Sequence, residues 1–162
     1  MTIKFKGKLA VDTTVLDNLK GNLVKATSQV GKAGYTADQI HPTHKVPLSN
    51  IAFYNTFGSK KGHIPERPFM QDGALDSRIN ISKQLAKGFT DILIRGDSSK
   101  ALKAGAETLA HYISSAIREG NFTPNAPETI RKKGKDKPPM TDTGYLATAI
   151  KTYLDKKDLS DG

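Results

Sequence analysis

The stretch between Pro68 and Gly120 constrains the fold most, because it carries two long apolar patterns with helical spacing. Gly96-Asp97 separates them, since this glycine can end one helix and the aspartate can cap the next. Pro68 stands where the first turn of a helix tolerates proline. We expect the first helix to bury Phe69, Leu75, Ile79, Ser82, Leu85, Phe89, Ile92 and Leu93, and the second to bury Leu102, Ala106, Leu109, Ile113, Ala116 and Ile117.

Shorter elements are predicted on both sides of this helical pair. Alternation over residues 2–11 predicts a strand, and helical spacing over residues 13–31 predicts an amphipathic helix that Gly31 or Gly34 can end. Residues 35–47 are polar and contain prolines, which favours a loop. Ile51, Phe53 and Phe57 suggest a strand over residues 50–56, closed by Gly58.

The C-terminal part is expected to combine an extended segment, a short helix and an edge strand. Residues 121–141 are rich in proline, glycine and charge, with one helical turn at Glu128–Lys132. A last short helix bears Leu146, Ala149 and Ile150, and residues 152–154 return as the strand.

These elements predict one α+β domain over residues 1–154, in which a small antiparallel or mixed sheet packs on two to three long helices. A chain of 162 residues with 36% hydrophobic content suffices for one modest core. Two extended arms, residues 55–68 and 121–143, are expected to leave the domain and reach a neighbouring copy. Residues 155–162 form a polar C-terminal tail.

Composition excludes several kinds of chemistry. The chain has no cysteine, which removes disulfides, thiolate metal sites and cysteine nucleophiles. His41 and His44 would need further ligands from elsewhere to hold a metal, so ordinary loop histidines are favoured. No catalytic, cofactor-binding or metal-binding residue is nominated, and we expect the protein not to be an enzyme. No apolar run is long enough to cross a bilayer, so no membrane partner is expected.

A net charge of +9 predicts attraction to acidic partners. The densest basic cluster can contact DNA phosphates or an acidic protein, or lie on a solvated arm, and consists of Arg131, Lys132, Lys133, Lys135 and Lys137. The aromatics Phe53, Tyr54 and Phe57 can form a stacking platform for single-stranded nucleic acid, although a core position is favoured.

Two stretches of the sequence resemble the tail-component and virion-morphogenesis families of tailed bacteriophages. The first is Ile51–Ser59 followed by His63–Met70, where an aromatic and glycine turn leads to a Pro-x-Arg-Pro-Phe helix start. The second is Pro127–Gly134 followed by Lys137–Leu146, where a Lys-Gly pair precedes an Asp-Thr-Gly-x-Leu helix start. The resemblance covers residues 50–153, and the sequence departs from the family pattern at Glu66 and Met140.

The resemblance implies a non-enzymatic minor tail or neck protein of the virion, made in the bacterial host cytoplasm. Such a protein completes the tail or acts in the head-tail connector as a homo-oligomeric ring, often sixfold. Its partners would be further copies of itself, adjacent neck, tail-terminator or tail-tube proteins, and packaged DNA bound without sequence specificity.

Several residues of the two motifs are candidate interface positions. Arg67 can form a charge-assisted bond with a carboxylate of a neighbour, and Pro68 fixes the direction in which the chain enters the helix. Asp142 or Thr143 can cap the last helix. Gly144 allows the backbone of another segment to approach closely. A purely intramolecular role for each is equally open. Ring closure would hide the apolar arm residues, and the remaining candidates are Phe57, Gly58, Ile64, Phe69 and Met140.

Two other classes of function stay open at this point. A small basic nucleic-acid-binding domain would act as a monomer or dimer and bind DNA tightly at low salt. A hydrolase would need convergent titratable groups, and no pair with suitable spacing is evident.

Overall fold

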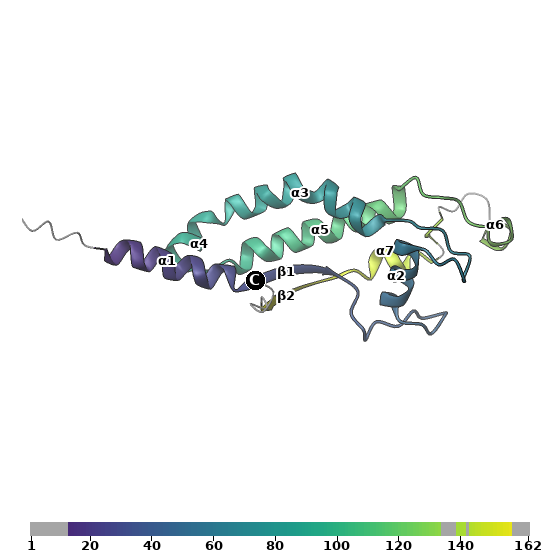
Figure 1. Cartoon of the computed structure of the whole chain (residues 1–162), viewed down its shortest axis with the longest axis horizontal. Coiled ribbons are helices and arrows are strands. Elements are labelled where there is room, and N and C mark those ends of the chain that lie inside the picture. Colours follow the sequence, from purple (N-terminus) through teal and green to yellow (C-terminus); the bar gives the residue numbers. More distant parts are fainter. Residues whose placement is uncertain (1–12, 134–138, 142, 157–162) are drawn as a thin grey trace, which may run out of the picture.

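The structure, a computed structural model, describes residues 13–133, 139–141 and 143–156. Within these ranges the fold is α+β and elongated, with α3 and α5 running along its length and a two-stranded ribbon packed along α5 (Figure 1). The strands are β1 (Gln29–Gly34) and β2 (Lys151–Lys156). The helices are α1 (Thr14–Thr27), α2 (Leu48–Phe57), α3 (Phe69–Lys87), α4 (Phe89–Arg95), α5 (Ser99–Glu119), α6 (Pro127–Lys133) and α7 (Tyr145–Thr148).

The long helical pair is confirmed, with one additional break. The first predicted helix is divided at Gly88 into α3 and α4, and α4 ends as expected at Gly96, whose φ is 67°. The stripe predicted for α5 faces inward, because Ala106, Ile113 and Ile117 are buried.

The stripe predicted for α3 is confirmed at Phe69 and wrong at Leu75 and Ile79. Leu75 and Ile79 are 61% and 70% exposed, and the buried positions are Phe69, Gly73 and Ser77, spaced four residues apart. The reason is the short distance between α3 and α5: a Cβ atom on Gly73 would lie 2.7 Å from the Cα atom of Ile113. Only small residues fit on the inner face there, and Leu75 and Ile79 are exposed on the outside.

The β-sheet is antiparallel and pairs the two ends of the described chain. The helix predicted over residues 13–31 ends at Thr27, and Gly31 and Gly34 lie in β1 instead of ending the helix. Gln29 pairs with Lys156 and Gly34 with Lys151, a long-range pairing that overrides the local helical pattern. The predicted edge strand is confirmed within β2, which also takes in the first residues of the predicted tail. The strand predicted over residues 2–11 and residues 157–162 lie outside the described residues.

The strand predicted over residues 50–56 is wrong, because these residues belong to α2. Leu48, Ala52 and Thr56 are buried at a spacing of four residues, which is helical. The alternation of Ile51 and Phe53 therefore does not indicate a strand, because the buried residues of this segment have helical spacing. The loop over residues 35–47 is confirmed.

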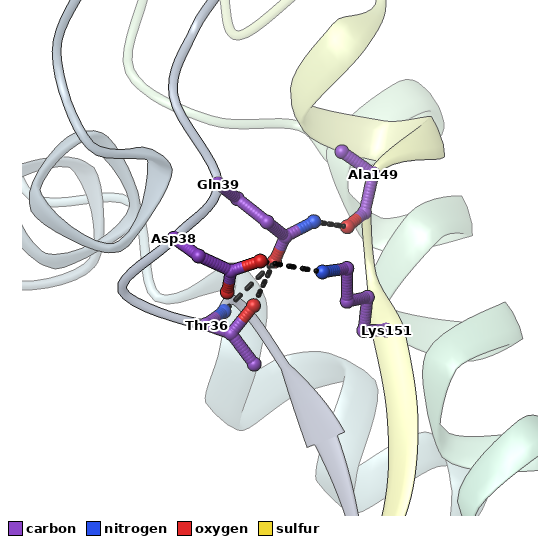
Figure 2. Close-up of polar contacts among 5 residues, drawn as sticks. All are labelled: Thr36, Asp38, Gln39, Ala149 and Lys151. Atoms are coloured by element: carbon purple, nitrogen blue, oxygen red, sulfur yellow. Dashed lines mark hydrogen bonds and ion pairs between the residues drawn. The ribbon is translucent and has the colours of Figure 1, made fainter.

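Figure 2 shows how this loop is held against the start of β2. Gln39 donates from Nε2 to the carbonyl of Ala149 and accepts from the backbone N–H and the hydroxyl of Thr36. Asp38 and Lys151 form an ion pair with 3.1 Å between Oδ2 and Nζ. Hydrogen bonds from Thr36 and then Lys151 hold the pKa of Asp38 below its usual value. Because both ionic side chains are exposed, the neutral bonds of Gln39 are the firmer tie.

The hydrophobic core lies at one end of the molecule, where α2, α7 and the adjoining ends of α3 and α5 meet (Figure 1). At the other end, α1 buries only Ala26 and α4 buries no residue. Among the described helices, none is long and apolar enough to cross a membrane. The core comprises Leu48, Ala52, Phe69, Ile113, Ile117, Met140, Leu146 and Ala147.

Gly73→Ala is expected to destabilise the protein, although alanine favours helix. The new Cβ would overlap the backbone of Ile113, and we expect a net loss of about 1–2 kcal/mol in the free energy of unfolding, measured by urea denaturation. Gly21→Ala on α1 is the matched control, because its Cβ meets no atom within 4 Å and should gain about 1 kcal/mol. Equal gains in both variants would contradict the close helix contact.

Candidate interaction site around Arg67

The segment after α2 folds back on its own domain, so the extended arm predicted over residues 55–68 is wrong. Gly58 ends α2 with a φ of 71°, a conformation that side chains with a Cβ rarely adopt. Ser59 and Ile64 then pair through backbone hydrogen bonds of 2.8 and 2.9 Å. A Cβ on residue 58 would lie 3.0 Å from the amide nitrogen of Glu66, so the returning chain packs directly on this turn.

Arg67 lies at the centre of this junction and is 4% exposed. Its Nη1 donates to Oδ1 of Asn55 and its Nη2 to Oδ1 of Asn125, each at 3.0 Å. Its Nε donates to the carbonyl of Thr123 at 3.1 Å. Burial lowers the pKa of Arg67, yet an arginine keeps its proton at neutral pH. The junction therefore holds a buried cation whose hydrogen-bond acceptors are all neutral.

Both asparagines are oriented by a second hydrogen bond. The Nδ2 of Asn55 donates to the carbonyl of Ile51 at 2.8 Å, and the Nδ2 of Asn125 donates to the carbonyl of Pro139 at 3.0 Å. Each amide oxygen is thereby turned toward Arg67. The guanidinium joins α2 to the beginning of the second predicted arm, and Asn125 links that beginning to Pro139. This is an intramolecular role, and a bond to a neighbour's carboxylate stays a prediction.

Two residues predicted to be hidden by ring closure are already buried within the chain. Phe69 and Met140 both belong to the core, so the expectation that a neighbour covers them is wrong. Pro68 immediately precedes α3, and its carbonyl accepts the N–H of Asp72 at 2.9 Å, which confirms its place at the helix start.

Phe57 remains available to a partner. It forms an exposed aromatic group with Phe53 and Tyr54 on α2, and ring centroids lie 5.0 Å apart for Phe53 and Phe57. The favoured core position for these three aromatics is therefore wrong. Ile64 is half-buried beside them.

The backbone at the start of α7 has free space around it. Gly144 has a φ of 72°, and a Cβ there would meet no atom within 4 Å. The hydroxyl of Thr143 accepts the N–H of Tyr145 at 3.3 Å. The N-cap residue of α7 is Gly144, however, and no side-chain cap hydrogen bond is made, so the capping role predicted for Thr143 is wrong. Asp142, the other capping candidate, lies outside the described residues.

The basic cluster falls partly on α6, at one tip of the molecule (Figure 1). Residues 127–133 form this helix, which extends the single turn that was predicted. Arg131 is exposed, and Lys132 and Lys133 belong to the same helix. Lys135 and Lys137 lie outside the described residues.

His41 has a structural role that the sequence did not indicate. Its ring is buried, and its Nδ1 accepts the backbone N–H groups of Thr43 and His44, each at 3.2 Å. The Nδ1 atom is therefore used by the turn that follows. Within the described part of the chain, no group of three or more metal-ligating side chains is present.

Arg67→Lys is expected to lower stability, because an ammonium cannot reach the three oxygens that the planar guanidinium contacts. Leaving buried amide oxygens without a donor should cost about 1–3 kcal/mol in urea denaturation. Arg78→Lys on the exposed side of α3 is the control and should change stability by less than about 0.5 kcal/mol. Equal midpoints for the two variants would show that the junction is not held by Arg67.

Comparison of the chain with family models, with curated proteins and with solved structures finds no match.

Proposed function

We propose that the protein is a structural component of a tailed-phage virion that assembles into a ring at the head-proximal end of the tail. Its role there is tail completion or head-to-tail joining. The resemblance of residues 50–153 to tail-component and virion-morphogenesis families supplies the class of function. The observation that carries the assembly is the apolar surface that the chain leaves uncovered at its coreless end.

That surface lies mainly on α1 and α4, which contact each other but bury almost nothing. The side-chain amide of Asn22 holds the two helices together by donating to the carbonyls of Leu93 and Ile94 at 2.9 Å. A helix as short as α4 gains little stability from its own hydrogen bonds and depends on packing. Six large apolar side chains on the two helices are at least 42% exposed: Val15, Leu16, Leu23, Val24, Phe89 and Ile94.

Covering these side chains is a sufficient driving force for assembly. Full burial of one such side chain contributes roughly 1.5–3 kcal/mol, so a neighbour that covers several supplies the free energy of a stable interface. Leu75 and Ile79 are also exposed, but they lie on α3 and are not part of this surface. Exposed apolar side chains gathered on two contacting helices mark an interaction site.

The arrangement favours a head-to-tail contact between copies. The α1–α4 surface lies at one end of the elongated molecule, and the exposed aromatics of α2 lie near the other (Figure 1). Two different patches on one chain give a heterologous interface, which closes into a ring when the rotation between copies allows it. Sixfold closure and contact with neck, tail-terminator or tail-tube proteins follow from the family resemblance.

The positive charge fits either of two surroundings within such a ring. Arg131 on α6 is exposed, and the chain carries a net charge of +9. Facing the lumen, basic side chains would contact packaged DNA without reading its sequence. Facing an adjacent ring, they would make assembly the salt-sensitive step. A small nucleic-acid-binding domain is the alternative, and it predicts unassembled protein that coats DNA at low salt.

Val24→Glu/Ile94→Glu is expected to prevent self-association while leaving the fold intact, because both side chains are exposed on the α1–α4 surface and their charged replacements would be buried between copies. Sedimentation velocity should give only monomer for the variant where the unmodified protein forms rings. Negative-stain microscopy with tails from a phage lacking the protein should show capped tails only for the unmodified protein.

Ala37→Glu/Asn121→Glu is the matched control, since it adds the same charge at exposed loop positions. It should assemble like the unmodified protein, and far-ultraviolet circular dichroism should be the same for all three. Rings formed equally well by the Val24→Glu/Ile94→Glu variant would exclude the α1–α4 surface from the interface. Monomers that ignore tails and coat DNA would overturn the neck function itself.

A further inference from the structure

A cavity of about 320 Å³ opens beside Arg67. It lies where α2, the turn after it, α6 and α7 come together, and its size is at the lower end of the range for small-ligand pockets. Its polar lining includes Arg67, Asn125, Thr129, His41, His44 and His63.

Arg67 sets the electrostatics of this cavity. A guanidinium has five N–H groups, and three of them bond to the uncharged oxygens of Asn55, Thr123 and Asn125. Among the described residues no ion pair offsets its charge, although a buried cation is ordinarily paired. The cavity wall thus keeps a positive charge and unused donor capacity.

The rest of the described lining adds polar side chains and no negative charge. His63 occupies the tight turn after α2 with a φ of 50°, and no aspartate or glutamate occurs among the described lining residues. The remaining wall is apolar and includes Ile51, Ile64, Met140 and Leu146. A ligand with an anionic group at the end of a short apolar chain is complementary to a cavity with one cationic wall and one apolar wall.

We propose that the cavity binds the side-chain carboxylate of an acidic peptide segment on a partner protein. The methylene groups of the ligand lie against Ile64 and Met140, and the carboxylate accepts from Arg67, the donor with the best geometry for it. A nucleic-acid phosphate is disfavoured, because Arg67 is 4% exposed and a backbone phosphate carries sugars on both sides. The binding chemistry does not require that the protein act at a phage neck.

The test uses the full chain, labelled with ¹⁵N, and a short peptide, acetylated and amidated, that carries two glutamates between glycines. Saturable shifts of the Arg67 Nε–H and of amides lining the cavity are expected in two-dimensional spectra. The same peptide with glutamines should bind at least about tenfold more weakly, since it lacks the charge-assisted bond. Equal binding of the two peptides, or no saturable shift with the glutamate peptide, would overturn the proposal.

Thr129→Glu places a carboxylate of the chain itself on the cavity wall and should weaken the glutamate peptide about tenfold. Ala37→Glu adds the same charge away from the cavity and should bind like the unmodified protein. Equal weakening in both variants would indicate a diffuse charge effect and count against a specific site. If a short single-stranded oligonucleotide shifts the cavity resonances at lower concentration than the peptide does, the ligand of the cavity is a nucleic acid and the carboxylate proposal is wrong.

Discussion

The contact between α3 and α5 is the constraint on which the rest of the structure depends. Residue 73 has no side chain, and the backbone of α3 consequently approaches Ile113 at van der Waals distance. This approach leaves Phe69, Gly73 and Ser77 as the buried positions of α3 and leaves Leu75 and Ile79 exposed. The close helix pair also gives the β-ribbon a surface on α5 to pack against.

The same constraint produces a molecule with two unequal halves. One end has a core, and the Arg67 junction binds the surrounding loops to it by hydrogen bonds. The other end consists of α1 and α4, which contact each other but leave most of their large apolar side chains exposed in the described part of the chain. The end with the core is thus held by contacts within the chain, whereas the α1–α4 end exposes apolar side chains of the kind found at the centre of an interface.

The sequence predicted those features whose cause is local. Gly96 ends α4, Pro68 precedes α3 and the stripe of α5 faces inward, as expected from capping, proline geometry and period. The predictions from sequence failed where contacts between residues distant in sequence determine the structure. The outward face of α3 was assigned to the core because large apolar residues ordinarily mark a buried face. Arg67 was recognised as a candidate, yet its acceptors at Thr123 and Asn125 lie 56 and 58 residues away, and no local signal identifies them.

The pairing of β1 with β2 also bears on how the protein is made. Gln29 meets Lys156, so the sheet can form only after nearly the whole described chain has left the ribosome. Closing so long a loop is slow, whereas α3 and α5 are neighbours in sequence and can pair early. Until β2 arrives, β1 has no strand partner, and its backbone N–H and C=O groups can pair with another chain. During synthesis this unpaired strand is therefore the place where premature association between nascent chains would begin.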